Sequence, residues 1–301
     1  MNWKKALLCG GCLMLLAGCS TGQTTLSNGS EKLMTIGNKT MDKEDEYNLI
    51  KWVYGPTSAI NMVNNMIYDQ EIGLTDEIKK EAQETLDQYK EMDGFEEQIK
   101  AMGYESAEDY MNKVLVRPLQ KSALQEKYFS EAKQEIIDQF DPVLAIIIET
   151  NSQDNADKAL AALKEGQDGG KVGAQYASED AIYTGLEEII TTENNALPTS
   201  LLNAILDATQ DGVLNEVYTN DTSTDDKIYY VAKVVSRDYD KNLPMIIKAL
   251  SSNSQIAQDS QVFYLKKYDF EVHDQDLFDY YKVMNPEYLV SRPDLDKSSE
   301  S

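Results

Sequence analysis

A short run of apolar residues, VLAIIIE at positions 143–149, constrains the fold more than any other feature of this sequence. Its β-branched residues favour a strand, and the lack of polar alternation indicates that both faces of the strand are buried. Asp141 and Pro142 come directly before the run, where they end the preceding helix. We therefore predict the central strand of an α/β domain in the middle of a chain that otherwise shows helical periodicity.

Turn and helix signals after this run complete the domain. Residues 154–164 show helical spacing of their apolar positions, and Gly166 follows where a helix C-cap is expected. Pro198 opens a second helical run at a position that helices tolerate. The segments GLEEII, VLNEV and IYYVAKVV are typical of the remaining strands.

Helical patterns lie on both sides of this domain. Ile60, Val63 and Ile67 recur at i, i+3 and i+7, and Ser106 with Asp109 forms a capping box. Two helical parts that flank an α/β unit suggest that the unit is inserted into one helical lobe. The predicted fold class is therefore α+β, with a helical lobe at 34–140, the α/β domain at 141–238, a helical segment at 239–285 that completes the lobe, and a disordered tail at 286–301.

The first residues have the form of an export signal. Lys4 and Lys5 precede an apolar stretch at 6–17 that is too short for a membrane-spanning helix. The run LAGC, residues 16–19, resembles the lipobox of bacterial lipoproteins. The resemblance implies that residues 1–18 are removed and that Cys19 carries the lipid, with residues 19–33 as a flexible tether. An ordinary cleaved signal that releases an unanchored protein is the alternative.

Residue counts exclude several classes of function. The formal net charge is −24, which repels nucleic acid and anionic surfaces. Cys9 and Cys12 lie in the predicted signal, so the mature chain keeps Cys19 as its one cysteine and His273 as its one histidine. We therefore expect no disulfide, no thiol or histidine triad, no metal site and no cofactor. We expect His273 itself to be an exposed, solvated residue.

Three further segments carry a family resemblance. ALKEGQDGGKVGAQYASED, LPTSLLNAILDATQDGV and YYVAKVV occur in that order after the apolar run. Together with the lipobox and the helical lobe, they resemble the PrsA-type extracytoplasmic foldase lipoproteins of Gram-positive bacteria, whose parvulin domain is a peptidyl-prolyl isomerase (PpiC, or rotamase). The resemblance implies SurA-like N-terminal helices and covers nearly the whole mature chain.

The family's catalytic residues are replaced in this chain. The resemblance implies one histidine on the first strand and one on the last, linked through a Cys or Asp beneath a pocket for the proline ring. These histidine positions align with Ala145 and Tyr230, and two pocket positions align with Leu197 and Leu201. Because His273 is the one histidine of the chain, we expect a parvulin fold without this chemistry.

The resemblance implies a foldase or chaperone on the outer face of the bacterial cytoplasmic membrane. Its partners are unfolded or partly folded exported proteins and the membrane that holds its lipid; a homodimer is also considered because helical lobes of the family often dimerise. Two alternatives stay open: a weak isomerase that works through Leu197, Leu201 and desolvation, and a surface adhesin or binding lipoprotein. Flexible methionines are candidates for client contact, with ordinary core packing as the alternative: Met62, Met66, Met92, Met102 and Met111.

Overall fold

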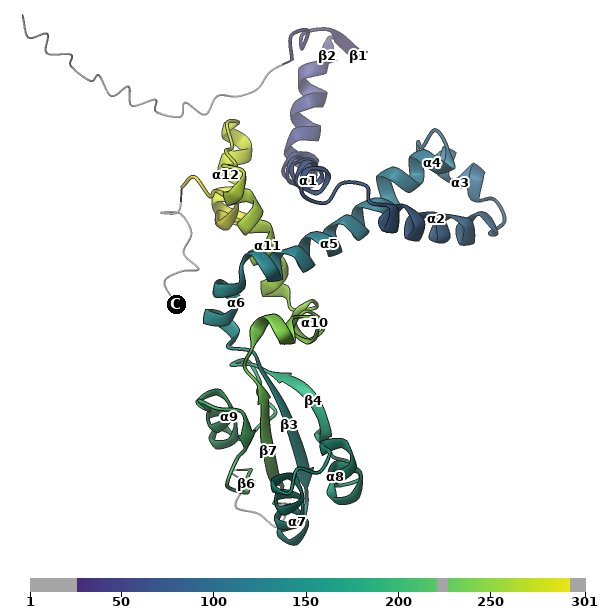
Figure 1. Cartoon of the computed structure of the whole chain (residues 1–301). Helices are drawn as coiled ribbons and strands as arrows, with labels where there is room; N and C mark the ends of the chain where they lie inside the picture. Colours follow the sequence, from purple (N-terminus) through teal and green to yellow (C-terminus); the bar gives the residue numbers. More distant parts are fainter. Residues whose placement is uncertain (1–25, 221–226, 293–301) are drawn as a thin grey trace, which may run out of the picture. The chain divides into compact units, whose positions relative to one another are not determined.

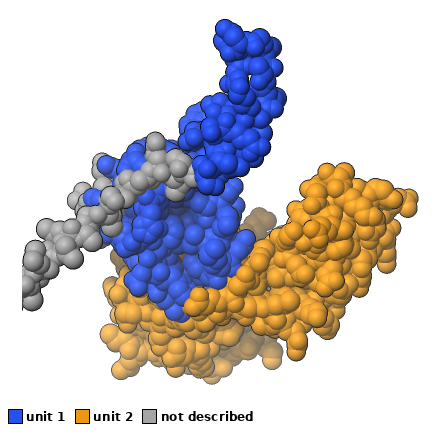
Figure 2. Space-filling model, turned by 90° about the horizontal axis from the view of Figure 1, so that it is seen from above, with its two compact units in different colours: residues 1–67, 264–301 blue, residues 68–263 orange. Residues whose placement is uncertain are grey.

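The chain has an α+β fold whose helices and strands form two compact units (Figure 1, Figure 2). We describe it from a computed structural model that covers residues 26–220 and 227–292. One unit combines the N-terminal residues up to Ile67 with the C-terminal residues from Tyr264, and the other unit holds Tyr68–Phe263. The predicted signal peptide, residues 1–18, and the lipidation residue Cys19 lie outside the described residues.

The first unit begins with a small hairpin that leads into a long helix. Its strands are β1 (Lys32–Ile36) and β2 (Lys39–Asp42), which pair antiparallel, and α1 (Lys43–Glu71) follows without a break. The tether predicted up to residue 33 therefore overlaps the start of β1.

The C-terminal part of the first unit packs beside α1. It holds α12 (Gln275–Met284) and the short helix η2 (Pro286–Tyr288), and Leu289 behind η2 is buried. The expectation of disorder from residue 286 is thus wrong for the described residues 286–292, because Leu289 has a core to enter. Tyr281 of α12 donates a hydrogen bond to the carbonyl of Pro56 in α1 at 2.5 Å.

A buried ion pair joins α1 to α12. Lys51 donates to Asp274 at 2.8 Å and to Asp276 at 2.5 Å, and the side chains of Lys51 and Asp274 are 8% and 7% exposed. Asp274 is also the N-cap of α12, since it accepts bonds from the amides of Asp276 and Leu277. Burial by itself would lower the pKa of Lys51, but the hydrogen bonds and charges of Asp274 and Asp276 outweigh burial and raise this pKa.

We predict that Lys51→Met destabilises the first unit by about 3–5 kcal/mol, because it leaves the Asp274 carboxylate buried without its cation. Lys43→Met is the control: it breaks the exposed pair with Glu31 and should change stability by less than about 1 kcal/mol. Because the pKa of Lys51 is raised, its contribution is complete below pH ~10.5 and is lost as the pH rises through the folded value. Urea unfolding, with hydrogen exchange over α12, measures both effects; equal midpoints for the two variants contradict this assignment.

The second unit contains the remaining helices of the lobe. Its first helix is α2 (Asp76–Lys90). Ile78, Ala82 and Leu86 of α2 form a core with Phe95, Ile99 and Met111. The last helical run of the predicted lobe is divided at Ala132, where φ is −102° and ψ is 28°. The helices of this part are α2 (Asp76–Lys90), α3 (Phe95–Ala101), α4 (Ala107–Tyr110), the π-helix η1 (Met111–Leu115), α5 (Val116–Glu131), α6 (Lys133–Phe140), α10 (Tyr239–Leu250) and α11 (Ser254–Lys267).

The helices before and after the α/β domain contact each other within this unit. The hydroxyl of Tyr239 in α10 donates to the carbonyl of Phe129 in α5 at 2.8 Å, and both residues are buried. At the base of the domain, Arg237 binds both carboxylate oxygens of Asp141 at 2.8 and 2.9 Å. Arg237 also donates to the carbonyls of Ile205 and Ala208, at the end of the helix α9 (Thr199–Leu206). One side chain thus links the residues where the chain enters and leaves the α/β domain to α9.

The α/β domain is built on one antiparallel sheet (Figure 1). Its central strand is β3 (Val143–Thr150), the predicted apolar run, and all eight residues of β3 are buried. The sheet order is β4-β3-β7-β5, with β6 also paired to β7. The other elements are α7 (Gln153–Lys164), α8 (Gly169–Tyr176), β4 (Thr184–Ile190), α9 (Thr199–Leu206), β5 (Gly212–Val213), β6 (Tyr218–Thr219) and β7 (Tyr229–Ser236).

Two glycines let α8 lie directly on the sheet. A Cβ at Gly169 would stand 2.7 Å from the carbonyl oxygen of Gly185, and a Cβ at Gly173 would overlap the carbonyl of Thr184. Gly185 itself has φ +85°, where a side chain is strained. From sequence these glycines would only weaken a helix by about 1 kcal/mol each; the structure shows that they are required for close backbone contact.

We predict that Gly173→Ala destabilises the domain by more than about 2 kcal/mol, because backbone atoms must move to admit the methyl group. Gly170→Ala in the same helix is the matched control. Its Cβ would meet ordinary contacts at 3.5 and 3.6 Å, so helix propensity should dominate and stability should rise by up to about 1 kcal/mol. Opposite signs in thermal unfolding are expected, whereas stabilisation by both substitutions contradicts the close packing.

Candidate functional site

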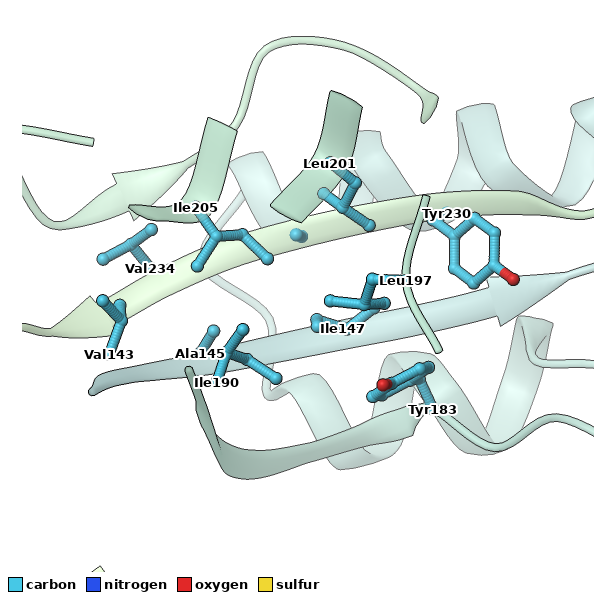
Figure 3. Close-up of a cluster of buried hydrophobic side chains, with 11 residues drawn as sticks. Val143, Ala145, Ile147, Tyr183, Ile190, Leu197, Leu201, Ile205, Tyr230 and Val234 are labelled. Atoms are coloured by element: carbon cyan, nitrogen blue, oxygen red, sulfur yellow. The ribbon is translucent and has the colours of Figure 1, made fainter. Parts of the chain in front are cut away.

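The face of the sheet beneath α9 is where the parvulin resemblance predicts a site (Figure 3). Side chains from β3, β4 and β7 meet here with residues from α9 and the loop before it. All of them are buried and all but two are aliphatic. The cluster contains Val143, Ala145, Ile147, Tyr183, Ile190, Leu197, Leu201, Ile205, Tyr230, Ala232 and Val234.

The register of the sheet separates the two residues that replace histidines. Ala145 pairs with Val234, whereas Tyr230 pairs with Glu149, so the two positions lie four residues apart along the strands. Ile147 pairs with Ala232 and is therefore the diagonal neighbour of Tyr230 on the same face. The structure thus places Ala145 and Tyr230 in one cluster but not beside each other. Glu149 is the β3 residue directly opposite Tyr230, and Ile147 is its diagonal neighbour.

The two predicted pocket residues fill the cluster. Leu201 is completely buried and Leu197 is 7% exposed, so both pack against the sheet. Asn194 fixes the approach to α9, because its side-chain oxygen accepts bonds from the amides of Ala196 and Leu197 at 3.1 and 3.0 Å. The leucines therefore act as core residues that cover Ala145 and Tyr230.

Polar groups occur at the edge of this face. Burial, with the nearby Glu149 and Tyr183, raises the pKa of Tyr230 to about 12. Burial also raises the pKa of Tyr183, although Asn194 donates a hydrogen bond to its hydroxyl at 3.1 Å. The pKa of Glu188, the partner of Ala145 on β4, is raised by burial. A phenol with a pKa of about 12 stays protonated at neutral pH, so Tyr230 cannot serve as a general base there.

Sequence reasoning did not single out Ile147, Tyr183, Glu149 or Glu188. The signal for Glu149 was available, since it is the one charged residue of the apolar run. Its carboxylate is buried and accepts the amide of Ile182 at 3.2 Å, which ties the loop before β4 to β3. Placing Ile147 beside Tyr230 required the strand register, which the sequence does not contain.

The remaining candidates lie away from this face. His273 is 75% exposed in its side chain and stands 3.8 Å from Glu271, in agreement with the expected solvated residue. Within residues 26–220 and 227–292, no cluster of three His, Cys, Asp or Glu side chains could hold a metal ion. Core packing holds for Met111 but is the wrong interpretation for the four exposed methionines: Met62, Met66, Met92 and Met102.

We predict that Leu201→Asp unfolds the α/β domain, because an unpaired carboxylate would replace a fully buried leucine. Loss of any isomerase activity in this variant would therefore report unfolding and not loss of a proline pocket. Asn203→Asp, at an exposed position of α9, is the matched control and should melt close to the parent protein. Near-ultraviolet circular dichroism against temperature makes the comparison; a natively folded Leu201→Asp protein would indicate an open pocket.

Comparison with known proteins gives a relative in sequence. No family model matches the chain. The chain is 26% identical over 252 residues to the foldase protein PrsA of Streptococcus mutans, an alignment that covers 79% of this chain and 72% of that protein.

Among solved structures, PrsA of Bacillus cereus is 17% identical with a TM-score of 0.46, covering 85% of this chain and 99% of that one. PrsA of Streptococcus pneumoniae is 19% identical with a TM-score of 0.36, covering 83% and 98%.

The fold and the site together define an α/β domain with one antiparallel sheet, joined to a helical lobe, whose sheet face beneath α9 is apolar. In sequence, the chain is similar to the foldase protein PrsA of Streptococcus mutans.

Proposed function

We propose that this chain is a foldase of the holding type: it keeps newly exported proteins from aggregating and does not catalyse prolyl isomerisation. The observation that carries the proposal is the packed cluster under α9. An isomerase needs an open pocket for the proline ring, and here Leu197 and Leu201 occupy that face. The name of its Streptococcus mutans relative supports the foldase role.

The absence of a two-histidine network supports the same proposal. The resemblance implies that two histidines are linked, whereas the register pairs Tyr230 with Glu149 and puts Ile147 diagonal to it. Ala145 and Ile147 carry no proton to exchange, and the carboxylate of Glu149 is bound by the amide of Ile182. The domain would then contribute structure and surface rather than proton-transfer chemistry.

A lipid anchor at Cys19 is part of the proposal and rests on the sequence LAGC. No helix among the described residues combines the length and the apolar character that crossing a bilayer requires. Two or more acyl chains hold a protein on a membrane durably, since each buried methylene contributes about 0.8 kcal/mol. The protein would then meet its clients on the outer face of the cytoplasmic membrane.

Exposed methionines in the second unit offer a surface for such clients. Met92 follows α2 and is 61% exposed, and Met102 ends α3 and is 54% exposed. A thioether on an unbranched side chain adapts to many apolar partners at little conformational strain. The helix between them, α3, is only seven residues long, so both side chains belong to one short stretch of surface.

The proposal is tested with protein from residue 20 onward and a client whose refolding is limited by prolyl isomerisation. We expect an unchanged slow phase and reduced light scattering in the same cuvette. A slow phase that accelerates in proportion to added protein would establish catalysis. No effect on either signal would favour a dedicated binding lipoprotein.

The client surface gives a second prediction. Met92→Gln together with Met102→Gln should weaken the suppression of light scattering, because the polar amide removes the apolar contact from an exposed position. Glu96→Gln together with Glu97→Gln, exposed on the same helix, is the control and should suppress scattering at least as well as the parent. Equal losses in both double variants would show that α3 contributes through charge and not through its methionines.

A further inference from the structure

The start of the described chain exposes an unusual amount of apolar surface. We call residues Lys32–Tyr54, which comprise β1, β2 and the first turns of α1, the N-terminal arm. Ile36, at the end of β1 beside the hairpin turn, is 80% exposed, and Trp52 on α1 is 81% exposed. The other large exposed apolar side chains of the arm are Leu33, Met34, Leu49, Ile50, Val53 and Tyr54.

The packing of α1 explains why these residues stay uncovered. Lys51 points to the ion pair at α12, and a Cβ at Gly55 would lie 3.4 Å from Leu277 of α12, so one side of α1 faces its neighbour. Trp52, Val53 and Tyr54 occupy the positions between these two contacts and are exposed. The hairpin is also uncovered, since every residue of β1 is exposed to solvent. An apolar surface of this extent marks an interaction site.

The position of the arm in the chain indicates its partner. Cys19 precedes Leu26, the first described residue, by seven positions. Even a fully extended segment of that length spans no more than about 25 Å. If Cys19 carries the lipid, the arm is the first folded part of the protein beyond the membrane surface.

The charge of the hairpin and the aromatic residues of the arm fit the same partner. Residues 32–41 contain Lys32 and Lys39 and no acidic residue, although the whole chain has a net charge of −24. Lysine side chains are attracted to anionic headgroups, and Trp and Tyr favour the interface between water and lipid. Four acidic residues at the end of β2 and the start of α1, Asp42, Glu44, Asp45 and Glu46, balance the four lysines of the arm. We therefore place the contact at the hairpin tip and at the exposed apolar side chains of α1, and not at the start of that helix.

We propose that the N-terminal arm docks on the phospholipid bilayer, with Ile36 at the hairpin tip and Trp52 on α1 in contact with lipid. The inference rests on the proposed lipid anchor, which brings the arm to the membrane. Docking would fix the first unit against the bilayer, so that the protein would be held by its own surface as well as by its acyl chains.

The chain supplies an intrinsic probe for this contact. Its two tryptophans are Trp3, in the predicted signal, and Trp52, in the arm. The lipidated protein, purified from membranes and reconstituted in vesicles containing anionic lipid, is measured with brominated and with ordinary acyl chains. A Trp3→Phe form excludes any signal from the N-terminus. We expect bromine to quench Trp52 strongly and its emission to shift to the blue on reconstitution.

Two variants make the result specific. Ile36→Asp should lose most of the quenching, because the hairpin tip can no longer enter the interface. Ile36 is 80% exposed, so the substitution should leave the fold intact, and far-ultraviolet circular dichroism verifies this. Ile182→Asp, at a 70% exposed position of the other unit, should be quenched like the parent. Equal quenching in all three proteins would overturn the role of the hairpin.

Flotation of the vesicles separates this inference from the anchor. Protein that floats while Trp52 stays accessible to aqueous iodide and unquenched by bromine would overturn docking and leave the anchor intact. Protein that fails to float would contradict the anchor, and unquenched Trp52 would overturn docking in that case too. A blue shift that depends on protein concentration and not on brominated lipid would overturn docking in favour of a second copy of the chain.

Discussion

The strand β3 is the constraint on which the rest of the α/β domain depends. It pairs on one side with β4 and on the other with β7, and all of its side chains are buried. A strand in this position must be apolar or must satisfy its polar groups internally, because water does not reach it. The single carboxylate, Glu149, does so by binding the amide of Ile182. Any catalytic group on β3 would have needed similar support.

This constraint separates what the sequence could predict from what it could not. The apolar run, the helix signals and the turn residues were sufficient to predict β3, β4, β7, α7, α9 and the α+β class. The prediction of a strand at VLNEV is wrong, because β5 ends at Val213 and β6 begins at Tyr218. The partners across the sheet were not predictable, because shifting an alignment by two residues along a strand keeps every side chain on the same face. Ala145 therefore looked as suitable as Ile147, and only the pairing of Glu149 with Tyr230 distinguishes them.

The glycines of α8 show a second limit of sequence reasoning. Helix propensity treats Gly169 and Gly173 as defects, since it considers the helix alone. In the fold, their missing side chains admit the carbonyls of Gly185 and Thr184 against the helix. The same substitution can thus lower stability through tertiary contact while raising intrinsic helix formation, and tertiary contact decides wherever two backbones touch. Tertiary contact likewise decides that Met111 lies in the core, whereas Met92 lies at the surface.

The chemistry of the α9 face follows from energetics as well as from residue identity. Rotation about a prolyl bond has a barrier of about 18–20 kcal/mol, and an enzyme lowers it by holding the twisted amide in a shaped, water-excluding pocket. At the α9 face Leu201 is completely buried and Leu197 is 7% exposed, so a ring could enter only if these side chains moved. Moving them would expose apolar side chains from β3 and β7 together, at about 25 cal/mol per Å². Any binding of proline at this face would therefore have to offset the free energy of packing of the domain.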